Sequence, residues 1–333
     1  MPELRYEPVT KTWVIIATER AKRPSNFAPP RLPRKEGQEC PFCPGNEKAT
    51  PPEVMAYRPK DTVPDSPGWQ VRVVPNKFPA LNPEAAAGAT IRRDFFHAVE
   101  GAGAHEVIIE TPDHERSFAT QEADEILLAL RSWQDRYIGL GENRNLAYTQ
   151  IFKNHGAVAG ASLEHPHSQL IATPLVPVTL AAELANTGDY YAEHGRCFFC
   201  DALEKEEREG SRLAWRDENV VAFCPFASRF PLEVWFLPRR HQESFAVATK
   251  AQLFSLAGAL QAITRRLFTE MHDPPFNLLL HSAPYRGGDY HASYHWHLEL
   301  LPRVTIIAGF ELGTGMYINP TPPEMAGEFY RAE

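Results

Sequence analysis

The sequence predicts an α+β fold in which one unit, an antiparallel sheet with a packed helix, occurs twice along the chain. Three observations predict it: a Cys-x-x-Cys pair and a His-x-His pair each occur twice in the same order, and helical periodicity with flanking β-rich runs lies between them. The middle histidine precedes the first histidine of the pair by 51 residues in one copy (His114 to His165) and by 54 in the other (His241 to His295). Agreement in both order and spacing indicates an internal duplication.

The chain length fits two copies, since 333 residues with 43% hydrophobic content can bury two cores. The same composition excludes a disordered chain. Pro174, Pro177 and the polar run 186–191 lie between the copies and predict a linker there. We therefore expect an N-terminal domain over residues 1–185 and a C-terminal domain over residues 186–333.

Charge and cysteine usage narrow the function. The net charge of −8 argues against a nucleic-acid partner, which requires a clustered basic surface. The sequence has no run of 18 apolar residues and no signal-peptide core at its start, so we expect no membrane association and a cytoplasmic location. Four of the 5 cysteines form two Cys-x-x-Cys pairs, which in a reducing compartment bind metal or perform redox chemistry.

The secondary structure of each copy follows from its periodicity. Apolar residues recur at helical spacing over 253–267 and, less regularly, over 126–137, so each copy has a helix with one face to bury. Short β-rich runs bounded by Pro and Gly predict strands at 13–17, 71–74, 106–110, 148–153, 168–173, 220–223, 277–281 and 295–301. Strands in sequence around a packed helix predict one antiparallel sheet per copy.

Each Cys-x-x-Cys pair predicts a zinc site, because two thiolates at this spacing can bind one tetrahedral ion that histidines complete. The repeated histidines give two sets of four ligands, about two zinc ions per chain: Cys40, Cys43, His114, His165 and Cys197, Cys200, His241, His295. A redox dithiol or inert buried cysteines are the alternatives. A second metal site without cysteine, of the iron type, is a further alternative, with the ligands Glu183, His281, His295 and His297.

The segment 154–169 carries the residues of a catalytic site. Alternate residues of a strand share one face, so His165, His167 and Gln169 project together, and a metal could take His165 and leave His167 free. Neutral imidazole is a competent nucleophile toward phosphorus. The glycines of this segment permit a loop close to phosphate oxygens, where Gln169, Ser162 and Asn154 could donate hydrogen bonds.

The second copy reads His-Trp-His-Leu-Glu and lacks the glycine-rich approach, so we expect catalysis in the first copy alone. The competing interpretation makes both His-x-His pairs metal ligands of a zinc-stabilised binding module.

Taken together, these motifs resemble the galactose-1-phosphate uridylyltransferase branch of the histidine-triad superfamily. The resemblance spans nearly the whole chain and includes the strings at 20–24, 40–43, 75–80, 111–114, 162–169, 281–284 and 295–297. It implies a duplicated histidine-triad fold, a homodimer, and a two-step exchange through a covalent nucleotidyl-histidine.

The resemblance also implies roles for individual residues. His167 would attack the α-phosphate of a nucleotide sugar, Gln169 and Ser162 would hold the phosphoryl oxygens, and the carbonyl of His165 would orient the His167 ring. The residues that would bind the substrate are, around the nucleotide, Arg20, Arg23, Asn76 and Phe78, and, at the hexose, Phe310 and Glu311.

Two departures from the family pattern affect specificity. Ser168 stands where the family has glycine, which resembles the related branch that includes plant ADP-glucose phosphorylase. That branch carries a second Cys-x-x-Cys zinc site in place of iron, which favours the set of Cys197 over that of Glu183. Thr305 and Tyr317 replace a lysine and a glutamine expected near the hexose.

The expected function is the exchange of a nucleotidyl group between a nucleotide sugar and a sugar 1-phosphate, with UDP-glucose:hexose-1-phosphate uridylyltransferase first. The alternative is ADP-glucose phosphorylase, in which phosphate is the acceptor. A histidine-triad nucleotide hydrolase, in which water resolves the same intermediate, is a third interpretation.

Overall fold

The structure is a computed structural model and describes residues 2–22, 40–85, 90–93 and 95–332. Arg23, one of the residues expected at the nucleotide, lies outside the described residues. Among the described residues, no helix is both long and apolar enough to cross a bilayer.

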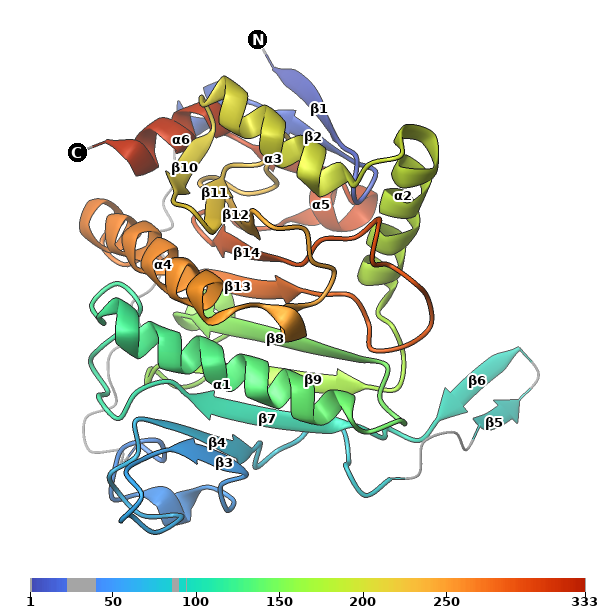
Figure 1. Ribbon diagram of the computed structural model, residues 1–333. Helices are drawn as coiled ribbons and strands as arrows, with labels where there is room; N and C mark the ends of the chain where they lie inside the picture. The colour runs from blue at the N-terminus through green and yellow to red at the C-terminus, as the bar shows by residue number, and fades with distance from the viewer. Residues whose placement is uncertain (1, 23–39, 86–89, 94, 333) are drawn as a thin grey trace.

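A ten-stranded sheet forms the centre of the molecule (Figure 1), and its strands run in the order β10-β11-β12-β14-β13-β8-β9-β7-β4-β3. Every neighbouring pair in it is antiparallel. The bounds of its strands are β3 (Met55–Tyr57), β4 (Val71–Pro75), β7 (Ala104–Ile109), β8 (Tyr148–His155), β9 (His167–Thr173), β10 (Leu213–Arg216), β11 (Val220–Phe223), β12 (Val234–Pro238), β13 (Phe276–His281) and β14 (His297–Pro302).

The strand order is symmetric about its middle and confirms the duplication. Five strands of the first half (β3, β4, β7, β9, β8) mirror five of the second (β10, β11, β12, β14, β13). The α+β fold with an antiparallel set of strands and a packed helix in each half is confirmed. The two sets form one sheet and not two, because β8 and β13 pair along their length, from Ile151 opposite Leu280 to His155 opposite Phe276. This pairing satisfies the backbone groups of two strands that would otherwise be open edges.

One long helix from each half covers the same face of the sheet (Figure 1). Helices α1 (Ala123–Gly141) and α4 (Lys250–Met271) lie side by side there and contact each other. α4 begins with a capping box of Thr249 and Gln252, and in α1 the carboxylate of Glu125 accepts from the backbone N–H of Glu122, so backbone donors at both helix starts are satisfied. Their apolar stripes are buried, and the fully buried Trp133 of α1 alone contributes roughly 1.5–3 kcal/mol.

The opposite face of the second half is covered by α2 (Val178–His194) and α3 (Phe198–Glu209). The polar run 186–191, expected as a linker, lies inside α2. Leu180, Leu184 and Thr187 recur at helical spacing and are buried, so tertiary packing decides the conformation of this segment. The division of the chain after residue 185 stays a prediction, and residue 185 itself lies within α2.

The remaining elements extend both halves. A three-stranded sheet joins β1 (Glu3–Glu7) and β2 (Thr12–Ile16) to β15 (Tyr317–Asn319), so the start of the chain packs beside its end. The hairpin of β5 (Thr90–Arg93) and β6 (Phe96–Val99) projects from the body (Figure 1). The short helices are α5 (Gly309–Thr314), α6 (Pro323–Arg331) and the 3-10 turns η1 (Thr18–Lys22), η2 (Glu47–Ala49), η3 (Ala157–Ala159) and η4 (Phe245–Val247).

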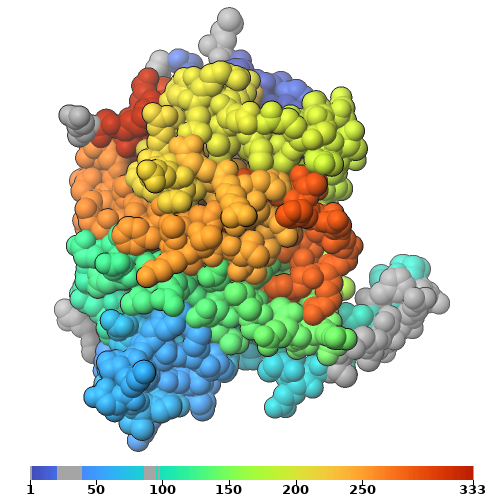
Figure 2. All heavy atoms as spheres, viewed as in Figure 1, coloured from blue at the N-terminus to red at the C-terminus, as the bar shows by residue number. Residues whose placement is uncertain are grey.

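The two halves form one continuous surface. In Figure 2 the first half, blue to green, meets the second half, yellow to red, and the N-terminal strands lie at the far end of the second half.

Candidate active site and metal sites

The structure brings the four residues of the first predicted zinc set together. Sγ of Cys43 lies 3.4 Å from Nδ1 of His114 and 3.6 Å from Nδ1 of His165, and the two Nδ1 atoms are 3.3 Å apart. With Cys40, all four ligand atoms lie within 4.8 Å of one another. Nε2 of His165 donates to the carbonyl of Thr111 at 2.8 Å, so its Nδ1 keeps a lone pair directed at the cluster. This group can hold a metal ion.

The second set has the same geometry. Sγ of Cys200 lies 3.2 Å from Nδ1 of His241 and 3.7 Å from Nδ1 of His295, and Cys197 completes a group whose ligand atoms lie within 4.8 Å of one another. Nε2 of His241 donates to the carbonyl of His291 at 2.6 Å, which again leaves Nδ1 free for a metal.

The alternative iron-type set is divided by this arrangement. His295 directs Nδ1 toward Cys200, and the other three members, Glu183, His281 and His297, form a separate buried group. Two Cys/His clusters therefore form in matching places of the two halves.

His167 is the first residue of β9, and its ring is held in a neutral form. Its Nδ1 lies 2.7 Å from the carbonyl oxygen of His165, which can only accept, so Nδ1 carries the proton and Nε2 carries the lone pair. Burial lowers the pKa of His167 to about 4, which keeps the ring uncharged near pH 7. The ring of Phe42 packs against it, with centroids 5.3 Å apart.

A buried ion pair supports the strand that carries His167. Nζ of Lys153 lies 2.5 Å from a carboxylate oxygen of Glu110 and also donates to the carbonyl oxygen of His167 at 3.3 Å. Both side chains are almost fully buried. The ammonium lies close enough to add to the effect of burial and lower the pKa of His167 further.

The expected phosphoryl-binding residues lie on β9, on β8 and in the loop that joins them. Gln169 lies two residues along β9, and Asn154 on β8 accepts a hydrogen bond from Nδ2 of Asn277 at 2.8 Å. The loop before β9 depends on glycine, since Gly156 and Gly160 have φ of 80° and 93°, where a side chain would be strained. Ser162 lies exposed in that loop.

The expected substrate-binding residues occupy two regions. Asn76 and Phe78 follow β4, and Asn76 lies 3.1 Å from His105, which also contacts Gln169, so this loop adjoins the site. Phe78 is 83% exposed and available to a ligand.

The other residues expected to bind the substrate, Arg20, Phe310 and Glu311, are not brought into a described contact with His167. Arg20 is exposed on η1. Phe310 and Glu311 belong to α5, which packs against β15.

Sequence reasoning missed two residues of this region, Ser168 as a packing residue and His105. Oγ of Ser168 accepts a hydrogen bond at 2.7 Å from the indole of Trp133, so Ser168 faces α1 while His167 and Gln169 face the opposite side of the sheet. The alternation of strand residues could have indicated the direction of Ser168, but its partner lies 35 residues away.

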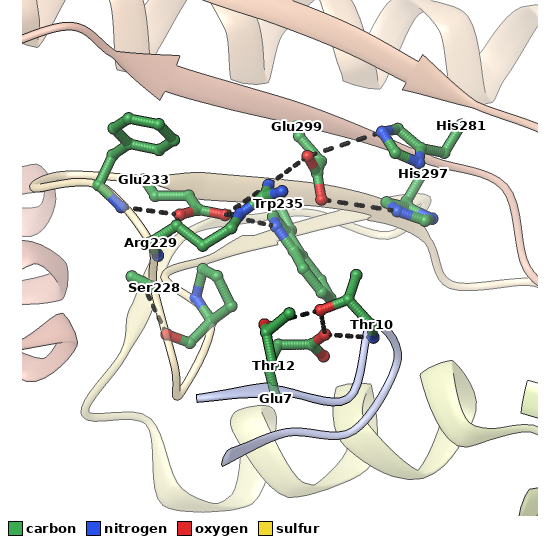
Figure 3. A network of polar contacts seen from close by, with 12 residues as sticks. Glu7, Thr10, Thr12, Ser228, Arg229, Glu233, Trp235, His281, His297 and Glu299 are labelled. Carbon is green, nitrogen blue, oxygen red and sulfur yellow. Dashed lines mark hydrogen bonds and ion pairs between the residues drawn. The ribbon is translucent and has the colours of Figure 1, made fainter. Parts of the chain in front are cut away.

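The matching place in the second half is filled by an ion-pair network (Figure 3). Glu299 occupies the position that Gln169 has in the first half, and it accepts a hydrogen bond at 2.5 Å from Arg229. Nε2 of His297 lies 4.0 Å from a carboxylate oxygen of Glu299, and its ring packs against Phe199 and Trp235. A carboxylate at this position repels phosphate, and aromatic rings fill the space.

The same network fixes the charge of His281. Burial disfavours a charged ring, but the carboxylates of Glu183 and Glu299 together raise the pKa of His281 to about 9. Nδ1 of His281 lies 3.1 Å from Glu183, which also accepts from the hydroxyl of Tyr294 at 3.0 Å. The second half therefore holds compensating buried charges where the first half has the neutral ring of His167.

The duplicated sheet, the paired Cys/His clusters and the His-x-His strand define a duplicated histidine-triad protein. Residues 1–177 match the family described as galactose-1-phosphate uridyl transferase, N-terminal domain, and the chain belongs to this family of nucleotidyltransferases. Residues 102–329 also match a domain of unknown function, DUF4921.

Individual relatives agree with this assignment. The chain is 35% identical to ADP-glucose phosphorylase of Arabidopsis thaliana over 99% of this chain and 92% of that protein. It is 29% identical to galactose-1-phosphate uridylyltransferase of Thermotoga maritima over 99% of this chain and 98% of that protein. A crystal structure of the Arabidopsis thaliana ADP-glucose phosphorylase with bound ADP-glucose superimposes with a TM-score of 0.86 at 33% identity, covering 100% of this chain and 99% of the other.

Proposed function

We propose that the protein transfers a nucleotidyl group from a nucleotide sugar to a phosphate acceptor through a covalent nucleotidyl-His167. The observation that carries this proposal is the hydrogen bond from Nδ1 of His167 to the carbonyl of His165, which leaves Nε2 with its lone pair on the face of β9 that also carries Gln169. A buried, neutral imidazole in this tautomer is ready to attack without first losing a proton.

The exchange has two displacements at the same phosphorus atom. Nε2 of His167 forms a bond to the α-phosphorus, and the bond from that phosphorus to the bridging oxygen breaks, releasing sugar 1-phosphate with the electron pair. An oxygen of the acceptor phosphate then attacks, the P–N bond breaks, and its electron pair returns to Nε2. While phosphorus is attached the ring is cationic, and its Nδ1–H stays bonded to the carbonyl of His165.

Two acceptor and base combinations fit this chemistry. We place the ADP-glucose phosphorylase reaction, with phosphate as acceptor, ahead of the uridylyl exchange favoured by the sequence. Supporting this order are the serine at position 168 and the second Cys/His cluster, both features that the resemblance associates with the phosphorylase branch, and the higher identity to the phosphorylase than to the Thermotoga maritima uridylyltransferase.

We also propose that both Cys/His clusters bind zinc. Two thiolates and two imidazoles with oriented rings fit a tetrahedral ion, and four protein ligands leave no open position for water. Zinc bound there would supply a structural crosslink, because the first set joins Cys40 and Cys43 to the loop of His114 and to His165, two residues before the nucleophile. A cytoplasmic homodimer, expected from the sequence and the resemblance, stays part of the proposal.

The experiment is covalent trapping with paired substrates. Protein is incubated with UDP-glucose or ADP-glucose labelled at the α-phosphate, and the label on the chain is followed in wild type, His167→Gly and the exposed-surface control His194→Gln. We expect ADP-glucose to leave an acid-labile label on wild type and on the control, and no label on His167→Gly. Addition of phosphate should remove the label from the protein.

Each of the other outcomes would favour one of the alternative functions over the proposed one. Label from UDP-glucose discharged by galactose 1-phosphate alone would replace the adenylyl reaction with the uridylyl one. Label that decays rapidly without acceptor would indicate a hydrolase. Absence of label with both nucleotide sugars, or label retained in His167→Gly, would overturn the proposed mechanism and leave a zinc-stabilised binding module.

A further inference from the structure

We infer that His105 is a positioning residue, which turns the amide of Gln169 so that its NH₂ group faces the substrate phosphate and ties the Asn76 loop to the same point. Its kinetic consequence rests on the function proposed above. The inference itself rests on the hydrogen bonds that join His105 of β7 to Gln169 of β9 and to the loop of Asn76, Phe78 and Ala80 after β4.

The strand pairing places His105 next to Gln169. In the antiparallel pair β7 and β9, Val107 lies opposite Gln169 and His105 lies opposite Ile171, so His105 and Gln169 are diagonal neighbours. Diagonal residues on one face are within reach of long side chains. Nε2 of His105 lies 2.9 Å from Oε1 of Gln169.

A backbone donor fixes the tautomer of His105. The amide N–H of Ala80 donates to Nδ1 of His105 at 3.1 Å, and because a peptide N–H can only donate, Nδ1 is the unprotonated nitrogen. In a neutral ring the proton is then on Nε2. This N–H needs an acceptor, and the oxygen of Gln169 supplies it.

The orientation of the Gln169 amide follows directly. With Oε1 bound to His105, the two hydrogens of Nε2 point away from the ring and are free to donate to an anion. If the amide were reversed, its NH₂ would meet the N–H of His105, donor against donor, and a partly buried polar contact would be lost. His105 therefore selects the amide orientation that stabilises charge developing on phosphoryl oxygens.

The side-chain amide of Asn76 is also held in one orientation next to His105. Its Oδ1 accepts from the backbone N–H of Phe78 at 2.9 Å, and its own backbone N–H donates to the carbonyl of His105 at 2.8 Å. Its Nδ2 lies 3.1 Å from Nε2 of His105, a contact between two donors that is imposed by the bond of Oδ1 to Phe78, so the N–H of His105 has its acceptor in Gln169 and not in Asn76. Two amide NH₂ groups, from Asn76 and Gln169, are thus presented around one histidine.

The kinetic test is a double-mutant cycle measured as the single-turnover rate of label transfer to His167 at saturating nucleotide sugar. We expect His105→Leu to slow transfer roughly 10- to 100-fold, somewhat less than loss of the Gln169 donor itself, which typically costs ~10²–10³. In the Gln169→Ala background, His105→Leu should slow transfer by less than about twofold, because the group it positions is gone.

A conservative variant, His105→Gln, distinguishes a positioning role of His105 from a general loss of structure in His105→Leu. The amide of His105→Gln can still donate to Gln169, so we expect it to recover most of the rate, while the matched control His194→Leu on the exposed end of α2 leaves the rate unchanged. Equal rates for His105→Leu and wild type, or full additivity with Gln169→Ala, would overturn the inference.

A spectroscopic measurement tests the geometry independently of activity. In protein labelled with ¹⁵N-histidine at pH 7, the signal that disappears in His105→Leu should show Nε2 protonated and Nδ1 bare. A proton on Nδ1 of His105 would refute the positioning role even if transfer occurs. Wild type that shows the expected tautomer but takes up no label would refute the proposed function alone.

Discussion

Replacing Ser168 with alanine removes one side of a hydrogen bond that is closed off from water. Oγ of Ser168 and Nε1 of Trp133 are 2.7 Å apart, and both residues are 0% exposed. The indole N–H then has no acceptor, and an unsatisfied buried donor costs ~1–3 kcal/mol. Ser168→Gly, which installs the glycine that the resemblance leads us to expect at this position, adds ~0.5–1 kcal/mol for glycine within a strand.

The assay is urea unfolding followed by far-UV circular dichroism, on wild type, Ser168→Ala, Trp133→Phe and the double variant. The pair should show a coupling energy of about 1 kcal/mol, because each single replacement breaks the same bond. Label transfer to His167 should stay within about twofold of wild type, since the hydroxyl faces α1 and not the site.

Two results would refute this reasoning. If Ser168→Ala changes the free energy of unfolding by less than about 0.5 kcal/mol, or if the two replacements are additive, the bond is not the reason for a serine at this position. If label transfer falls more than tenfold while stability is unchanged, Ser168 acts on the reaction and not on the packing.

The other predictions concern metal content and pH. Elemental analysis should give about two zinc ions per chain, with one lost in Cys43→Ser and one in Cys200→Ser; a third equivalent would place a metal at the Glu183 group. For His281, the folded pKa of about 9 lies above its ordinary value, so the contribution of its ion pairs is complete below pH 6.5 and is lost as pH rises through 9. The free energy of unfolding should fall by about 3 kcal/mol over that range, measured by urea unfolding, and this fall should be absent in His281→Gln.

The two Cys/His clusters and the strand that begins at His167 could be predicted from the sequence because repeated motifs of short range encode them. The same residue types recur in the same order in both copies, and the structure brings together the same four residues that were predicted for each set. Strands and helices within each copy were likewise predictable from alternation and helical spacing.

Contacts between distant residues could not be predicted in the same way. The pairing of β8 with β13, the position of the polar run 186–191 within α2, and the bond between Trp133 and Ser168 each depend on surfaces that meet only after folding. A single sequence gives the pattern of a face but not its partner. His105 was missed for the same reason, since its role depends on a backbone N–H in another loop.

The joint between β8 and β13 constrains the order of synthesis. Gln150 donates to the carbonyl of Leu280, 130 residues further along the chain, so β8 has no neighbour on that side until most of the polypeptide has left the ribosome. A nascent first half exposes an open strand edge during that interval, and such edges pair with other chains. Expression of residues 1–185 alone should therefore yield aggregated material, and chaperone capacity during translation should limit the yield of the full chain.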